Sequence, residues 1–154
     1  MAKEIKNSLN GSGLKIAIAV ARFNEVVTDK LLEGALRQLE LLGVAEKDVT
    51  VVRVPGAFEL PGVCRRLADS KKYSAVMAIG AVIRGETSHY DVVVNASTGG
   101  VASIAAEGKL PVILGILTTD TVDQAMNRAG LKAGNRGANG ASTAVEMANL
   151  YKAI

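Results

Sequence analysis

Cysteine and histidine are almost missing from this chain: each occurs once in 154 residues, as Cys64 and His89. A single cysteine cannot form an intrachain disulfide, and it has no second thiolate with which to share a metal ion. A zinc site needs several cysteine, histidine or carboxylate ligands, so a single histidine also argues against a zinc centre. The sequence therefore predicts a fold with neither disulfide nor zinc support.

Aromatic residues, net charge and long apolar runs are also limited. Phenylalanine and tyrosine make up 3% of the chain and tryptophan is absent, so aliphatic residues and alanine must form the core. The net charge is +3, and the basic residues are scattered, which argues against nucleic-acid binding. The apolar runs have strand length and the N-terminus lacks the apolar core of a signal peptide, so we expect a cytoplasmic protein without a membrane span.

What the chain does contain is apolar residues, 49% of the total, in segments that alternate between strand-like and helix-like patterns. Strands are predicted over residues 14–21, 49–54, 75–83 and 111–117. Helices are predicted from Thr28 as N-cap to Gly43, from Pro61 to about 68, over 90–106, after Asp120 as cap, and from the glycine-rich stretch 130–140 to about Tyr151. This alternation predicts an α/β fold, a four-stranded parallel sheet with helices on both faces.

The length predicts a single domain over residues 1–154, with a polar N-terminal arm over residues 1–12. The arm contains one alternating piece, residues 5–9, which is either a frayed end or a strand that pairs with a neighbouring subunit. A four-stranded sheet also has two open edges, which favours self-association.

In folds of this kind ligands bind beyond the carboxyl ends of the strands. The loops expected there are 22–24, 56–59, 84–89 and 118–119. They contain Phe23 and Phe58, the only phenylalanines, and Glu59. The phenylalanines suit either core packing or stacking on a ligand ring. Glu59 suits either a helix cap or a ligand contact.

The segment from Gly80 to Val93 is the most informative. It leaves a strand, turns at Arg84-Gly85 and enters a helix at His89. A glycine turn at a helix start can bind an anion, and a histidine nearby can transfer protons near neutral pH. The alternatives are a structural histidine and a surface ion pair for Arg84.

Six motifs follow one another along the chain: ARFN at 21–24, VPGAFELP at 54–61, GAVIRGETSHY at 80–90, GILTTD at 115–120, RAGLKAGNRG at 128–137 and EMANL at 146–150. In this order and spacing they resemble the lumazine synthase family, and the similarity covers nearly the whole chain. The resemblance implies a flavodoxin-like fold without metal or organic cofactor. It also implies a transferase of riboflavin biosynthesis, which condenses 5-amino-6-(D-ribitylamino)uracil with 3,4-dihydroxy-2-butanone 4-phosphate to give 6,7-dimethyl-8-ribityllumazine, phosphate and water.

The resemblance carries roles onto individual positions. Phe23 would stack on the pyrimidine, while the Asn24 backbone and Glu59 would hold the ribityl chain. Binding of the pyrimidine and its ribityl chain would involve Phe23, Asn24, Ala57, Phe58, Glu59, Ala81, Val82, Ile83, Leu114, Lys132 and Arg136. Gly85, Glu86 and Thr87 would bind the phosphate together with Arg128 of an adjacent subunit. His89 would shuttle protons, so His89 and Arg128 are the predicted catalytic residues.

The resemblance further implies a site between adjacent subunits of a pentamer, with small-molecule substrates and riboflavin synthase as a candidate protein partner. Family members with a short form of the 130–135 segment tend to build hollow icosahedral shells, so the resemblance also favours a shell of about 60 chains over an isolated pentamer.

Two positions depart from the family pattern. Leu114 stands where many members have phenylalanine, and Asn139 where many have a carboxylate. These departures leave open a relative that binds lumazine or flavin without turnover, or one whose main role is to form a shell. Fold analogy alone would also allow a flavodoxin-type nucleotide binder, in which His89 and the Arg128 segment would have no role.

Overall fold

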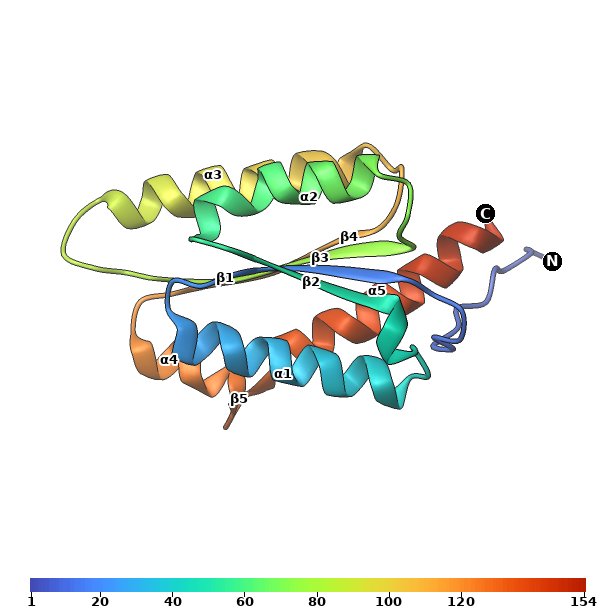
Figure 1. Ribbon diagram of the computed structural model, residues 1–154, viewed down its shortest axis with the longest axis horizontal. Coiled ribbons are helices and arrows are strands. Elements are labelled where there is room, and N and C mark those ends of the chain that lie inside the picture. The colour runs from blue at the N-terminus through green and yellow to red at the C-terminus, as the bar shows by residue number, and fades with distance from the viewer.

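Four parallel strands form the central layer of the computed structural model, which covers residues 1–154 (Figure 1). They are β1 (Ile16–Ala21), β2 (Val49–Val54), β3 (Ala75–Ile83) and β4 (Val112–Thr119), in the order β2-β1-β3-β4. Helices α2 (Leu60–Asp69) and α3 (His89–Ala106) cover one face. Helices α1 (Glu25–Leu41), α4 (Val122–Asn127) and α5 (Arg136–Ala153) lie on the other. The α/β prediction is confirmed, as a three-layer sandwich consistent with the flavodoxin-like fold.

Side chains of β1 alternate between two apolar cores, as the two-residue period of a strand requires. Ile16, Ile18 and Val20 pack in the core on the side of α1 and α5. The intervening alanines of β1 belong to the core under α2 and α3. On that side the two helices also approach each other closely: a Cβ added at Gly100 of α3 would lie 2.7 Å from Pro61 of α2. No helix is long and apolar enough to cross a membrane.

The predicted start of α1 is wrong. The helix begins at Glu25, three residues before Thr28, because Asn24 takes the left-handed conformation with φ of 63°. The carbonyl of Asn24 accepts hydrogen bonds from the N–H groups of Val27 and Thr28, so Thr28 lies inside the first turn. Thr28 is fully buried and its hydroxyl has no hydrogen-bond partner, so it is not the cap.

The region around Asp120 also differs from the prediction. Thr118 and Thr119, expected in a loop, continue β4, because β3 runs on to Ile83 and pairs with them. The cap of α4 is Thr121, whose hydroxyl accepts from the Gln124 N–H at 3.1 Å in a capping box. Asp120 is therefore free of the capping role and pairs with Arg84.

The glycine-rich stretch forms a short hairpin, β5 (Ala129–Leu131) and β6 (Gly134–Asn135), and α5 begins at once at Arg136. Gly137 and Gly140, which the prediction placed ahead of the helix, lie inside it. Gly137 sits against the Leu31 carbonyl of α1, where a Cβ has no room. Asn135 caps α5 and also donates to the Lys30 carbonyl at 3.0 Å, which joins the two helices.

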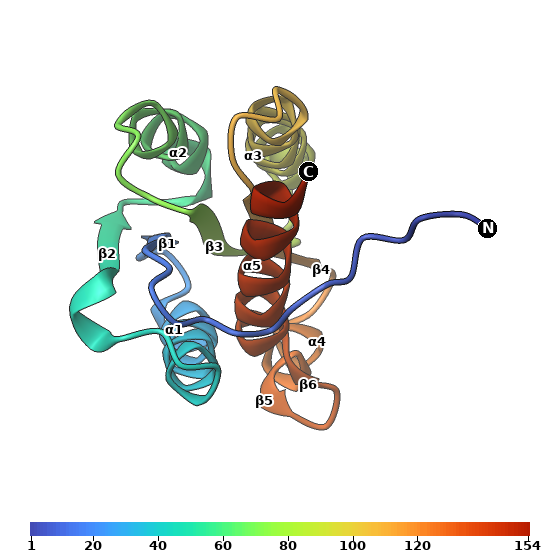
Figure 2. The same ribbon diagram turned by 90° about the vertical axis from the view of Figure 1, so that its right-hand side faces the viewer.

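Residues 1–10 form no helix or strand and run past α5 (Figure 2). Asn7 donates to Glu146 at 2.6 Å, and Asn149 donates to the carbonyls of Ser8 and Asn10, each at 2.9 Å. Within one chain these three hydrogen bonds attach the arm to α5. The β2 and β4 edges of the sheet stay open.

Candidate functional site

The carboxyl ends of β1, β2 and β3 lie at the left of Figure 1. There three loops and the start of α3 line a cavity of about 750 Å³. Most of the predicted site residues line it: Phe23, Asn24, Ala57, Phe58, Glu59, Ala81, Val82, Ile83, Gly85, Thr87 and His89. Residues from three separate stretches of the chain, 23–24, 55–59 and 81–93, therefore meet in one place. The parallel sheet brings this about because its strands end on the same side.

Phe23 and Phe58 are not core residues. Their side chains are 72% and 60% exposed, although aromatic rings normally lie inside. Both line the cavity from loops, Phe23 after β1 and Phe58 in the short 3₁₀ segment η2 (Ala57–Glu59) after β2. Two exposed rings beside a cavity are suited to stacking on a flat ligand.

Glu59 and Asn24 both line the cavity, and their side chains make different contacts. Glu59 occupies the N-cap position of α2 but makes no capping hydrogen bond, so the capping interpretation is not supported. Its carboxylate is exposed at the cavity instead. The side chain of Asn24 donates to the Ala81 carbonyl at 2.7 Å. That bond fixes the loop after β1 to β3, while the backbone N–H of Asn24 has no acceptor within the chain.

The backbone of β3 is open to the cavity. β1 pairs with β3 only as far as Ile79, whereas β3 continues to Ile83 with β4 as its one partner. The last four residues of β3 therefore lack a strand neighbour on the β1 side. Amide groups in that position can hydrogen-bond a planar heterocycle.

The loop between β3 and α3 contains the predicted anion site. Gly85 is outside the left-handed region, and a Cβ added there would meet nothing within 4 Å. The backbone conformation therefore does not require glycine. The missing side chain leaves free space beside the start of an 18-residue helix. The N-terminus of a helix attracts anions through its free N–H groups. Glu86 is exposed in the same loop but does not line the cavity.

His89 is the first residue of α3. Its backbone N–H donates to the Thr87 hydroxyl at 3.3 Å, and its imidazole makes no hydrogen bond within the chain. The side chain is exposed at the cavity. The imidazole is therefore available to a ligand in the cavity.

Arg84 lies outside the cavity, and the ion-pair interpretation is confirmed. Its Nε donates to Asp120 at 2.9 Å, and its guanidinium lies 4.3 Å from the ring centroid of Tyr90. Asp91 is 3.8 Å away. The hydrogen bond to Asp120, more than the surrounding charges, raises the pKa of Arg84 above its ordinary value.

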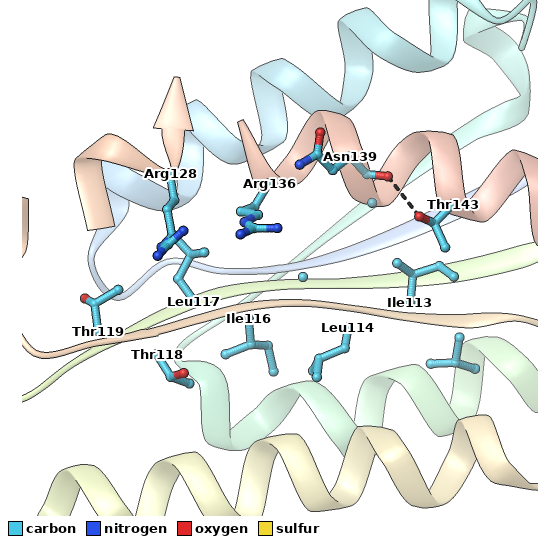
Figure 3. A pocket seen from close by; sticks show the side chains of 13 residues that line it. Ile113, Leu114, Ile116, Leu117, Thr118, Thr119, Arg128, Arg136, Asn139 and Thr143 are labelled. Carbon is cyan, nitrogen blue, oxygen red and sulfur yellow. Dashed lines mark hydrogen bonds between the residues drawn. The ribbon is translucent and has the colours of Figure 1, made fainter. Parts of the chain in front are cut away.

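The remaining predicted residues lie elsewhere. A second concave surface of about 490 Å³, the β4 surface, follows the edge strand β4 and includes Leu114, Arg128 and Arg136 (Figure 3). Both guanidinium groups lie on the α5 side of β4, together with Asn139 and Thr143, whereas Leu114 points to the other side. Lys132, exposed in the β5–β6 hairpin, lines neither surface.

Some lining residues were not predicted. Tyr90, Val92 and Val93 of α3 face the first cavity, and Thr143 of α5 lies one turn after Asn139 on the second surface. Helical spacing could have found Val92, Val93 and Thr143, because residues three or four positions from a site residue share its face. His89 and Val93 are such a pair.

Cys64 and the acidic residues do not add a further reactive centre. Burial raises the pKa of the Cys64 thiol to about 12, so this thiol stays protonated in the core under α2. No group of three or more histidine, cysteine, aspartate or glutamate side chains is arranged to hold a metal ion.

Fold and site together define a class of protein. It is a flavodoxin-like α/β protein with a substrate-sized cavity at the strand ends, two exposed aromatic rings on the cavity and an unengaged histidine beside a helix N-terminus. Such a cavity is suited to a flat ring together with an anionic or phosphorylated second ligand.

Comparison with known proteins makes this class specific. Residues 13–152 match the family described as 6,7-dimethyl-8-ribityllumazine synthase. The 6,7-dimethyl-8-ribityllumazine synthase of Desulfotalea psychrophila (strain LSv54 / DSM 12343) is 51% identical over 154 residues, which are 100% of this chain and 99% of that protein. The chain belongs to the 6,7-dimethyl-8-ribityllumazine synthase family, enzymes of riboflavin biosynthesis.

Proposed function

We propose that this chain condenses 5-amino-6-(D-ribitylamino)uracil with 3,4-dihydroxy-2-butanone 4-phosphate, in a site completed by an adjacent subunit. The observation that carries the proposal is the cavity at the strand ends, which places exposed aromatic rings, open backbone, a helix N-terminus and the one histidine around a single space. Membership of the lumazine synthase family supports the same reaction.

The pyrimidine occupies the part of the cavity between Phe23 and the end of β3. The exposed ring of Phe23 stacks on the heterocycle, and the unpaired side of β3 hydrogen-bonds its edge through Ala81, Val82 and Ile83. The free N–H of Asn24 and the carboxylate of Glu59 lie on the same cavity and hold the ribityl hydroxyls. Ala57 and Phe58 close the wall between them.

The phosphate of the second substrate binds where Gly85, Glu86 and Thr87 lead into α3. The space over Gly85, the Thr87 hydroxyl and the helix N-terminus are suited to a dianion. Donors fixed in advance stabilise the charge as phosphate leaves, which is where a preorganised site lowers the barrier most. A crystal grown in phosphate should contain an oxyanion at this loop.

His89 moves the protons. Attack of the pyrimidine amine on the ketone carbonyl, loss of water, elimination of phosphate and closure of the second ring each need a proton added or removed. An exposed imidazole at the cavity, engaged in no hydrogen bond of its own, can do both. The remaining acceleration comes from holding two reactants together.

A second chain supplies Arg128. Within one chain, the β4 surface is lined by Arg128, Arg136 and Leu114, whereas His89 lines the cavity at the strand ends. Each chain thus carries two partial sites, and a neighbour whose β4 surface covers the cavity joins them. The exposed Phe23 and Phe58 would be buried by that contact. Lys132 and Arg136 add positive charge at the same place.

The N-terminal arm and the open β2 edge support the assembly. We place residues 1–12 as an arm of the single lumazine synthase domain that pairs with a neighbouring subunit. In one chain the arm has polar contacts to α5 but no strand partner. Rings of five would then associate into a shell of about 60 chains.

The test is an absorbance and fluorescence assay with both substrates, run on the purified protein beside sedimentation. Lumazine formation well above the uncatalysed rate, by an oligomer and not by a monomer, is expected. Ligand binding without turnover would contradict the reaction and support a non-catalytic relative. Asn139 keeps this second possibility open. It is an amide on the β4 surface, at a position that is a carboxylate in many members of the family.

A further inference from the structure

Arg84 joins three elements around the loop that leads to His89. Its backbone N–H donates to the Thr119 carbonyl at 2.8 Å, at the end of β4. Its side chain donates to Asp120, just after β4, and its guanidinium covers the ring of Tyr90 in the first turn of α3. A second carboxylate, Asp91, also lies in that first turn, 3.8 Å away.

The loop itself has few other restraints. Residues 85–88 make two hydrogen bonds to the start of α3: the His89 N–H to the Thr87 hydroxyl at 3.3 Å, and the Asp91 N–H to the Ser88 carbonyl at 3.0 Å. Both lie at the far end of the loop. Arg84 is the residue that begins the loop, and it contacts Tyr90 and Asp91 directly after the loop ends. It therefore sets the distance between the two ends of the loop.

The arrangement is more than an isolated surface pair. Exposed ion pairs contribute little to stability by themselves. Arg84, however, combines a hydrogen-bonded carboxylate, an aromatic stacking face and a second carboxylate, which fixes the orientation of a planar guanidinium. Arg84 and its partners are absent from the cavity lining except for Tyr90, so any effect on substrate must act through the loop.

The Arg84–Asp120 pair is also connected through α4 to the β4 surface. Asp120 directly precedes Thr121, the cap of α4, and Arg128 is the residue at the other end of that short helix. The position of α4 relative to the loop is therefore fixed in part by Arg84 and Asp120. The Arg84–Asp120 contact therefore lies between the loop at the chain's own cavity and the α4 segment that leads to Arg128.

We propose that Arg84 is a positioning residue: through Asp120, Tyr90 and Asp91 it holds the Gly85–Ser88 loop and the His89 turn in the geometry that binds phosphate. The proposal rests on the proposed function, because it takes the phosphate-bearing substrate to be the ligand of this loop. It predicts that loss of the guanidinium affects the phosphate-bearing substrate far more than the pyrimidine.

The experiment uses full-length Arg84→Gln, Arg84→Lys, Asp120→Asn and the Arg84→Gln/Asp120→Asn double variant. Steady-state kinetics give KM for each substrate, and calorimetry gives Kd for inorganic phosphate. For Arg84→Gln we expect KM for the butanone phosphate and Kd for phosphate to rise about 10-fold, which corresponds to about 1.4 kcal/mol of binding free energy. KM for the pyrimidine should change less than about 2-fold. Asp120→Asn should raise the same two constants by a smaller factor, because Tyr90 and Asp91 still contact the guanidinium. The double variant should be no weaker than Arg84→Gln, because Asp120 acts only through Arg84. Arg84→Lys, which keeps the charge without the planar fork, should lie between.

Arg65→Gln is the matched control. Arg65 pairs with Glu107 between α2 and the end of α3, at 2.6 Å, and lines neither surface. It should leave all three constants unchanged. Wild-type phosphate constants in Arg84→Gln would overturn the proposal, as would equal rises for both substrates with a lowered melting temperature, or a wild-type protein that binds no phosphate. If the wild-type protein forms no lumazine, the proposed reaction fails, and the phosphate Kd values alone decide the role of Arg84.

Discussion

At the scale of single residues, His89 lies in a suitable position and its side chain has no partner in the chain. It opens α3 beside the anion-binding loop, and its imidazole is engaged in no hydrogen bond of the chain. Because no other imidazole exists, proton transfer cannot pass to a second histidine. The residue can therefore be tested by one substitution.

His89→Ala should lower turnover by roughly 10–10⁴-fold, the range expected when general acid–base help is lost. Far-ultraviolet circular dichroism and sedimentation should match the wild type, because an exposed side chain is removed. Steady-state rates of lumazine formation measure the effect. A well-folded His89→Ala protein with wild-type turnover would show that the histidine is not the proton carrier.

Phe23→Ala should weaken binding of a lumazine or flavin analogue by about 1–3 kcal/mol, through loss of one stacking face and its apolar contact. Fluorescence titration gives the Kd. Leu41→Ala is a fitting control, since Leu41 is equally exposed at 74% but lines neither surface. Unchanged analogue binding by Phe23→Ala would place the ring elsewhere. Leu114→Phe on the β4 surface should tighten binding or leave it as it is.

At the scale of elements, close helix contacts hold the layers in register. α1 and α5 approach through Gly137 and the Asn135 side chain, and α2 and α3 through Gly100 and Pro61. These contacts position the loops indirectly, because α1 and α3 begin at the cavity. Their loss should affect stability before it affects chemistry.

Gly137→Ala should lower the free energy of unfolding by about 1–3 kcal/mol, because the new methyl group meets the Leu31 carbonyl and the backbone must shift. Chemical denaturation measures this. The matched control is Gly62→Ala in α2, where a Cβ meets nothing within 4 Å. There alanine should stabilise by about 0.5–1 kcal/mol through its better helix propensity. Equal effects at both positions would contradict the close contact.

The Arg65–Glu107 pair should make the link between α2 and α3 depend on pH. The hydrogen bond from Arg65 lowers the pKa of Glu107 below its model-compound value of 4.5. A carboxyl whose pKa is lowered on folding stabilises the protein above its unfolded pKa and loses that contribution as pH falls through the folded value. Denaturation of Arg65→Gln and wild type should thus differ at neutral pH and converge in acid. A difference that persists below the folded pKa would contradict the linkage.

At the scale of the whole molecule, the arrangement of two partial sites makes assembly a condition of activity. His89 lies on the cavity and Arg128 on the β4 surface of the same chain. If the site is shared, one chain contributes the histidine and its neighbour the arginine. Each chain has a mass of 16.0 kDa. A pentamer would then sediment as ~80 kDa and a closed shell of about 60 chains as ~960 kDa.

Mixing two defective variants tests the shared site directly. His89→Ala and Arg128→Ala chains, each nearly inactive alone, should recover about one quarter of wild-type activity when co-assembled in equal amounts, because a random ring leaves that fraction of sites intact. Co-expressed protein and separately purified mixtures are compared in the lumazine assay. Failure to recover activity in a confirmed mixed oligomer would place both residues in a site within one chain. An active monomer would overturn the shared site as well.

The architecture could be predicted from the order of residues, because the pattern of apolar runs is a local property. The runs over residues 49–54 and 75–83 became β2 and β3 with the predicted bounds, and the alternation of strands and helices required a parallel sheet. It also pointed to the loops at the strand ends, since parallel strands end on the same side. The capping of α1 and α4 was predicted wrongly, because Thr28 and Asp120 have the right chemistry but long-range contacts decided their roles: Asn24 is fixed to Ala81, and Asp120 to Arg84.

Which of the predicted site residues lie together became known from the folded chain. Eleven of them line one cavity, while Arg128, Arg136 and Leu114 lie on the β4 surface and Glu86 and Lys132 on neither. No sequence pattern contains that division, because it depends on β4 being the edge strand and on α5 packing beside it. The exposure of Phe23 and Phe58 was likewise open until the fold placed them on the cavity. Composition specifies which residues are available for chemistry, and packing specifies which of them share a space.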